Sequence, residues 1–209
     1  MAHRATTLVV TAIGAYLLGR LGTPVGEGVA CSAAPPPDSA PLRDAEAIAT
    51  PGAHHHELDG LVGTWNAEVT VRSMVDGPAT LIRGTVNRAW VLGGRFLRET
   101  TVLGEGEARV EQLAYIGFDN FDGQYQVVRM DTASTAMRCG TGTLHPGERV
   151  MHVTGGRRDP ATGRLVNGWT KLDSSDPERH VLIEYQTDEQ GRTFRAAETV
   201  LTRAATQPR

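Results

Sequence analysis

The chain has 209 residues, a formal net charge of −3 and 40% hydrophobic residues. It contains no long run of one charge sign, which argues against a nucleic-acid-binding protein. Its two cysteines, Cys31 and Cys139, form no C-x-x-C motif, so neither a disulfide framework nor a zinc site is predicted. Apart from an N-terminal segment of about fifty residues, the length fits one domain.

Residues 1–30 have the pattern of an export signal. A short basic start precedes an uncharged, mainly apolar run, Ala5–Leu18, which is short for a membrane-spanning helix. Small residues at Gly28 and Ala30 allow cleavage before Cys31, and the same stretch loosely resembles a lipobox, in which the cysteine carries lipid. A cleaved signal, lipidation at Cys31 and an uncleaved anchor remain alternatives. Each predicts a protein that is periplasmic, at the cell surface or tethered to a membrane.

The composition changes twice more along the chain. Residues 31–53 are rich in proline and alanine and contain no aromatic residue, which predicts a disordered spacer. Residues 54–204 are expected to form the folded domain. Residues 205–209 are expected to be a short disordered tail.

The domain is predicted to begin with a short helix at His55–Leu61 and to continue as strands. In Thr64–Arg72 apolar and polar residues alternate, as in a half-buried antiparallel strand. Further strand-like runs, joined by turns rich in glycine, aspartate and proline, are Thr80–Trp90, Arg95–Leu103, Arg109–Phe118, Gln124–Asp131, Thr135–Leu144, Arg149–Thr154, Leu165–Leu172, His180–Thr187 and Thr193–Thr202. The pattern predicts an all-β fold of about ten antiparallel strands in an up-and-down barrel, with a sandwich as the alternative.

Ordered motifs spanning essentially the whole domain resemble the bacterial domain-of-unknown-function 1579 family. They lie at residues 55–65, 91–97, 117–120, 125–131, 159–163 and 198–203. The family usually has tyrosine where Phe118 stands and tryptophan where Arg129 stands, and either departure could change what a cavity accepts. No common activity is established for the family, so the resemblance implies a fold and not a function.

Gly63 and Trp65, preceded by a helical turn, also resemble the start of the calycin superfamily, which includes lipocalins, fatty-acid-binding proteins and nitrobindin-like domains. In those barrels the tryptophan plugs the closed end, and a late arginine commonly packs over its ring as a cation–π contact. The resemblance therefore implies a structural pair of Trp65 and Arg203.

Tyr125, Arg129 and Asp131 share one face of a predicted strand by period-two counting. If that face lines the barrel interior, charge and hydroxyl lie beside apolar wall, as in a ligand pocket. The alternative is a buried structural ion pair. We take these three residues as the candidate ligand-binding site.

The histidines give no firm metal site. The run His54–Glu57 lacks the second histidine of a His-Glu-x-x-His motif, and a polar helix start is favoured over a looser metal site that would include His152 or His180. A haem would need one inward-facing histidine at the open mouth and stays a minor alternative. Cys139 is expected to pack rather than act as a nucleophile. No metal or cofactor is predicted.

Three functional hypotheses follow. The first is a non-catalytic exported barrel that binds a small lipophilic molecule and meets a membrane only through its N-terminus. The second is an enzyme that uses the same cavity, with Asp131, Tyr125 or a strand histidine as acid or base. The third is a structural or interaction module of the cell envelope with a filled core. A barrel packed solid with side chains would exclude the first two.

Overall fold

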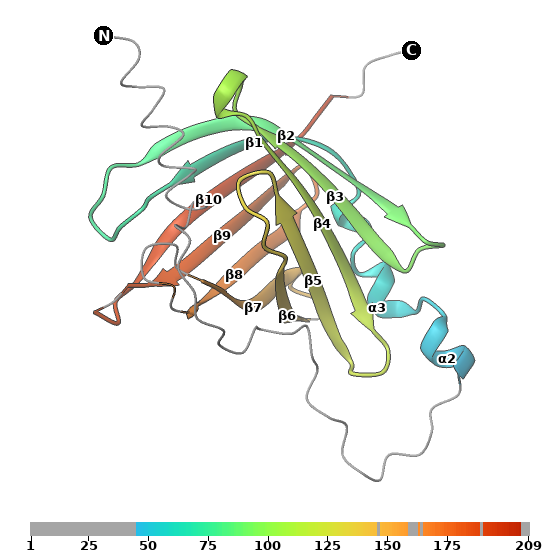
Figure 1. Cartoon of the computed structure of the whole chain (residues 1–209). Coiled ribbons are helices and arrows are strands. Elements are labelled where there is room, and N and C mark those ends of the chain that lie inside the picture. Colours follow the sequence, from blue (N-terminus) through green and yellow to red (C-terminus); the bar gives the residue numbers. More distant parts are fainter. Residues whose placement is uncertain (1–44, 146, 159–162, 164, 189, 206–209) are drawn as a thin grey trace.

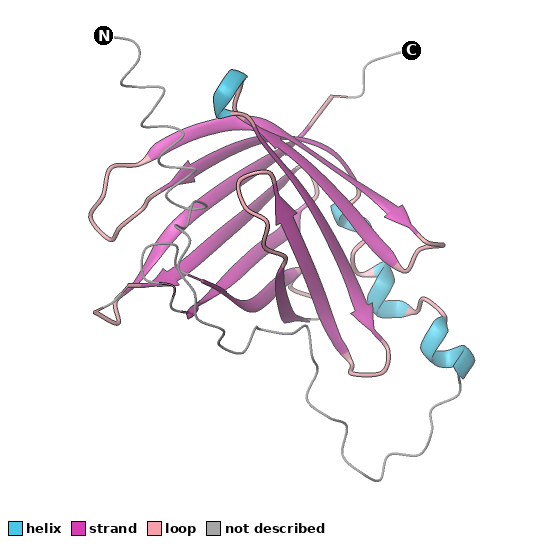
Figure 2. Ribbon diagram, in the orientation of Figure 1, coloured by secondary structure: helices cyan, strands magenta, loops and turns pink. Residues whose placement is uncertain are grey.

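The fold was obtained as a computed structural model that describes residues 45–145, 147–158, 163, 165–188 and 190–205. Its ten strands are β1 (Gly63–Val71), β2 (Thr80–Val91), β3 (Phe96–Leu103), β4 (Val110–Asp119), β5 (Gln124–Asp131), β6 (Arg138–His145), β7 (Val150–Arg158), β8 (Leu165–Asp176), β9 (Arg179–Thr187) and β10 (Thr193–Arg203). Each pairs antiparallel with its neighbours in the chain, and β1 pairs with β10 to close the barrel (Figures 1 and 2). The predicted up-and-down barrel is confirmed.

Alternation of side chains sets the two faces of the sheet. In β1, Trp65, Ala67, Val69 and Val71 are buried, whereas the residues between them are more exposed. Hairpin turns impose the antiparallel order, and several need backbone angles that favour glycine: Gly93 and Gly94 have φ of 66° and 82° between β2 and β3. Local sequence thus determines both the strands and the hairpins that join them.

Three short helical segments precede β1: α2 (Ala45–Ala49), α3 (Ala53–His56) and the 3₁₀ helix η1 (Asp59–Leu61). α3 and η1 cover one end of the barrel, which we call the closed end, whereas α2 has no buried residue. Leu58 and Leu61 insert into the main hydrophobic cluster, which also holds Leu97, Ile116, Tyr125, Met151 and Leu172. Burial of each leucine contributes about 2 kcal/mol. The expected helix at His55–Leu61 is therefore an α-turn followed by a 3₁₀ turn. These turns close this end of the barrel, and we call residues 45–62 the plug.

Trp65 and Arg203 form the predicted structural pair at this end. They are register partners on β1 and β10, and the Arg203 guanidinium carbon lies 4.2 Å from the Trp65 ring centroid. The indole Nε1 donates to the Leu61 carbonyl at 3.2 Å, and Arg203 Nη1 donates to the Val62 carbonyl at 3.2 Å. The pair thereby ties the first and last strands to the plug.

Several sequence predictions concern residues outside the described ranges. The export signal over 1–30 and lipidation at Cys31 lie outside them, as do 206–209 of the predicted tail. Of the predicted spacer 31–53, residues 45–53 are described and contain α2 and the first residue of α3. Among the described residues, no helix is long and apolar enough to cross a membrane.

Candidate functional site

The inner face of β5 carries the three candidate residues predicted from the sequence. Tyr125, Val127, Arg129 and Asp131 are partners in turn of Phe118, Ile116, Ala114 and Gln112 on β4, which include core residues. Period-two counting therefore placed them correctly on one face, and that face is the barrel interior. The face runs from the closed end at Tyr125 towards the opposite end at Asp131.

Two cavities lie in the part of the barrel interior that the structure describes. One, of about 140 Å³, lies mainly against β5 to β9 and has an apolar wall that includes Val127, Met151 and Val153. The other, of about 130 Å³, lies mainly against β1 to β4 and β10, with Val69 and Ile82 in its wall. Six residues line both cavities: Arg88, Glu99, Arg129, Arg138, Leu182 and Glu184. The barrel is therefore not packed solid.

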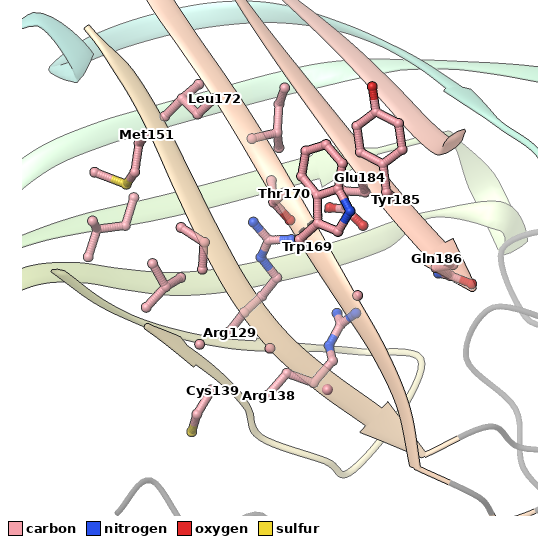
Figure 3. A pocket seen from close by; sticks show the side chains of 18 of the residues that line it. Arg129, Arg138, Cys139, Met151, Trp169, Thr170, Leu172, Glu184, Tyr185 and Gln186 are labelled. Atoms are coloured by element: carbon pink, nitrogen blue, oxygen red, sulfur yellow. Dashed lines mark hydrogen bonds and ion pairs between the residues drawn. The ribbon is translucent and has the colours of Figure 1, made fainter. Parts of the chain in front are cut away.

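Charged side chains occupy the region where the cavities meet. They form three ion pairs, which we call the charged belt: Arg88–Glu99, Arg129–Glu184 and Arg138–Asp131. Arg88 Nε lies 2.7 Å from Glu99 Oε2, and Arg129 Nη1 lies 2.8 Å from Glu184 Oε1. Figure 3 shows Arg129, Arg138 and Glu184 around the first cavity. Buried charges need such partners, because desolvation of an unpaired ion is costly.

The belt keeps Glu99 and Arg129 ionised. Burial alone would raise the pKa of Glu99, but the charges of Arg88 and Arg129 and hydrogen bonds from Arg88 and Thr101 hold that pKa below its ordinary value. Burial would lower the pKa of Arg129, but the carboxylates of Glu184 and Glu99 raise it instead. The cavities therefore meet at fixed charges within an apolar wall.

Glycines leave part of the first cavity's wall without side chains. Gly140 on β6 pairs with Gly155 on β7, which pairs with Gly168 on β8, and all three line the cavity. A Cβ at Gly155 would lie 2.8 Å from the Cys139 carbonyl oxygen, and one at Gly168 would lie 2.7 Å from the Tyr185 carbonyl oxygen. These approaches exclude larger residues without backbone shifts. Inward-facing glycines within strands are the feature of the sequence from which this cavity could have been predicted.

The structure separates Tyr125 from the other two candidate residues. Its hydroxyl donates towards Glu57 Oε2 at 2.5 Å and lies 3.0 Å from the His54 carbonyl oxygen. Burial, followed by the hydrogen bond and charge of Glu57, raises the tyrosine pKa. Tyr125 thus belongs to the closed end, whereas Arg129 and Asp131 belong to the charged belt.

A family model described as "Protein of unknown function (DUF1579)" matches residues 50–203. The chain belongs to this family. The ten-stranded closed barrel agrees with the calycin-like fold that the resemblance implied.

Among solved structures, this DUF1579 protein is similar to the S-type phycobiliprotein lyase CPES from Guillardia theta. The TM-score is 0.54 and the sequence identity 8%, over 75% of this chain and 100% of that chain. A similarity at this identity shows the shared fold alone. No curated protein matches this chain.

Several motif residues of this DUF1579 protein fasten the plug to the barrel. The Asn120 side-chain amide donates to the carbonyls of Ala47, Ile48 and Thr50 at 3.1, 3.1 and 2.8 Å. The Trp90 indole donates to Asp59 Oδ1 at 2.8 Å. These contacts, like that between Tyr125 and Glu57, are architectural.

The two departures from the family pattern lie in different places. Phe118 lies at the closed end, where its ring stacks on His54 with centroids 4.3 Å apart. Arg129 lies in the charged belt, so the second departure places a charge on the cavity wall.

The histidines occupy separate parts of this DUF1579 protein. His54 and His56 pair with Glu57 and Asp59 on the surface of the plug. His152 lies on the outer face of β7 beside Trp169, and His180 is buried against Trp65 at the closed end. Within the described ranges, no group of three or more His, Cys, Asp or Glu residues could hold a metal ion. Neither strand histidine lies where the haem alternative required one.

Cys139 is disulfide-bonded, and the described part of the chain contains no free cysteine. Its side chain points away from the residues around the first cavity (Figure 3). No disulfide was predicted from the sequence, and that prediction is wrong at Cys139, because cysteine spacing carries no information on which residues the fold brings close. A disulfide-bonded sulfur cannot act as a nucleophilic thiol.

Proposed function

We propose that the barrel binds a small lipophilic molecule in its interior. The observation that carries the proposal is the pair of apolar-walled cavities that meet at the charged belt. Ligand sites in proteins are concave and largely apolar, with a few polar groups that orient the ligand. A purely structural module would instead be expected to fill its core, because unfilled volume costs stability.

An enzyme that uses the cavity is the second candidate, favoured by the phycobiliprotein lyase of similar fold. Asp131 is the candidate acid or base that lines a cavity, although it is paired with Arg138. Tyr125 is poorly suited to that role, because its proton is held by Glu57 and its pKa is raised. If a substrate is identified, Asp131→Asn should abolish turnover. Unchanged turnover in that variant would remove Asp131 from the reaction.

Ligand binding is tested first with protein purified from its own host and analysed by native mass spectrometry. A co-purifying lipophilic molecule supports the binding function. The delipidated protein is then titrated with Nile red, an uncharged lipophilic dye whose fluorescence rises in apolar surroundings.

Two neighbouring valines on β5 provide a matched pair of variants. Val127 lines the first cavity and Val128 faces outward, because consecutive strand residues point to opposite faces. Val127→Trp should reduce dye binding at least tenfold, whereas Val128→Trp should keep it. Equal dye binding by the two folded variants, or no binding by the unaltered protein, would refute the proposal.

Export is part of the proposal and is supported by the basic and apolar pattern of residues 1–30. The protein should then be recovered outside the cytoplasm when cells are fractionated. Its intact mass separates the alternatives, because cleavage before Cys31 and an uncleaved N-terminus give different masses. A lipid adduct on Cys31 would give a third mass and would leave no other cysteine of this chain to pair with Cys139. Full-length protein in the cytoplasmic fraction would contradict export.

A further inference from the structure

Arg88 presents an unsatisfied donor at the junction of the cavities. Its side chain is 3% exposed, and its Nε donates to Glu99 Oε2 at 2.7 Å. The other Glu99 oxygen lies 3.4 Å from both Thr101 Oγ1 and Gln112 Nε2. In the part of the chain that the structure describes, buried Arg88 Nη1 has no hydrogen-bond partner. Buried N–H groups without an acceptor are rare in proteins, because each loses its hydrogen bonds to water.

Arg129 repeats this arrangement. Its Nη1 donates to Glu184 Oε1 at 2.8 Å, but its buried Nε has no acceptor among the described residues. Arg88 and Arg129 both line both cavities. The two spare donors therefore belong to side chains that line both cavities.

The positive and negative charges in the walls of the two cavities are equal in number. The charged side chains described in the cavity walls are three arginines and three acids, and they are joined one to one in the charged belt. An arginine has several N–H groups, of which one ion-pair contact uses only part. The belt therefore has spare donors but no excess positive charge.

We infer that the ligand carries an uncharged oxygen acceptor, such as a ketone, ester or amide carbonyl, on an apolar body, and that Arg88 and Arg129 donate to that oxygen. This inference rests on the proposed binding function. A carbonyl satisfies the spare donors without adding charge. A carboxylate would place a further negative charge near Glu99 and Glu184, where the low dielectric of the interior strengthens repulsion.

Two probes of equal shape test the head group. Nonan-2-one and octanoate have the same chain and the same number of non-hydrogen atoms, and differ in a methyl ketone against a carboxylate. At neutral pH, competition with Nile red should show that nonan-2-one binds at least tenfold more tightly than octanoate. Octanoate binding as tightly as the ketone, or more tightly, would overturn the inference in favour of an anion site.

A double variant tests the donor. Arg88→Met with Glu99→Gln removes the ion pair as a unit, so no buried charge is left alone and the net charge is unchanged. Its affinity for nonan-2-one should fall about tenfold or more, whereas 2-methylnonane, which has the same shape and no oxygen, should bind as before. The matched control is Arg83→Met with Glu68→Gln, which removes an exposed pair on the outer face and should change neither affinity.

The outcomes separate the two claims. If the hydrocarbon binds but the ketone has no advantage over it, or if the folded double variant keeps full ketone affinity, the head-group inference fails and the binding function stands. If no probe displaces the dye and Val127→Trp behaves as the unaltered protein does, the proposed function itself fails, and the inference fails with it.

Discussion

His180 should make the barrel less stable in mild acid. Its ring is 0% exposed and lies 4.1 Å from the Trp65 ring, centroid to centroid. In the described part of the chain, neither ring nitrogen has a hydrogen-bond partner. Burial, then the charges of Arg88 and Arg203, lower the pKa of His180 to about 4, against a smaller opposing effect of Asp176 and Asp173. The folded protein therefore keeps this histidine neutral.

The sign and size follow from proton linkage. In the unfolded chain the ordinary pKa is 6.5, so between pH 6.5 and about 4 the unfolded state binds a proton that the folded state does not. The free energy of unfolding is thus fully maintained above 6.5 and falls as the pH drops towards about 4. At about 1.4 kcal/mol for each pH unit of difference, the full loss is about 3 kcal/mol.

The assay is urea unfolding followed by tryptophan fluorescence, from about pH 7.5 to about pH 4, on the unaltered protein and on His180→Phe. Phenylalanine keeps a ring against Trp65 but cannot be protonated. The free energy of unfolding of the variant should therefore fall by about 3 kcal/mol less over this range. His152→Phe, on the outer face, serves as the control and should follow the unaltered protein. If phenylalanine does not fit, His180→Leu makes the same comparison.

Parallel pH profiles for the unaltered protein and both His180 variants would refute the reasoning. Such a result would mean that the imidazole accepts a proton in the folded state as readily as in the unfolded chain. The contacts with Trp65 would then exclude much less water than the burial of the ring implies.

The other predictions concern the plug. Arg203→Met should lower the free energy of unfolding by about 1–3 kcal/mol, because it removes the Trp65 contact and the hydrogen bonds to the plug. Arg83→Met on the outer surface should lower it by under about 1 kcal/mol. Equal losses for the two variants in denaturant titrations would contradict a structural role for Arg203. Tyr125→Phe should lower the free energy of unfolding by about 1–3 kcal/mol, because it leaves Glu57 without its hydroxyl donor. The affinity for Nile red should stay unchanged. A weaker affinity would place Tyr125 in the ligand site. Asn120→Ala should speed proteolysis before β1 while leaving strand content by circular dichroism unchanged; an unchanged cleavage rate would show that this amide does not hold α2.

Structural features that depend on residues close together in the chain could be predicted from the sequence. Alternation in Thr64–Arg72 and glycine-containing turns such as Gly93–Gly94 predicted strands joined as hairpins, and the structure has these features. The pairing of Trp65 with Arg203 was also available, but from a resemblance to known barrels rather than from spacing. The same period-two rule placed Tyr125, Arg129 and Asp131 on one face.

The sequence by itself therefore determined the strands and their order as hairpins, because each strand and turn is encoded over a few consecutive residues, and it favoured a barrel over a sandwich. Only the tertiary structure decided which of the inward-facing residues meet. Arg129 and Glu184 are 55 residues apart in the chain, and the closure of the barrel together with the register of its strands brings them within 2.8 Å. Tyr125 was separated from the site by the plug, and Arg88 was added to it from β2. Such contacts depend on the pairing register of every strand between the two partners. A pattern within a few consecutive residues does not determine all of these registers together.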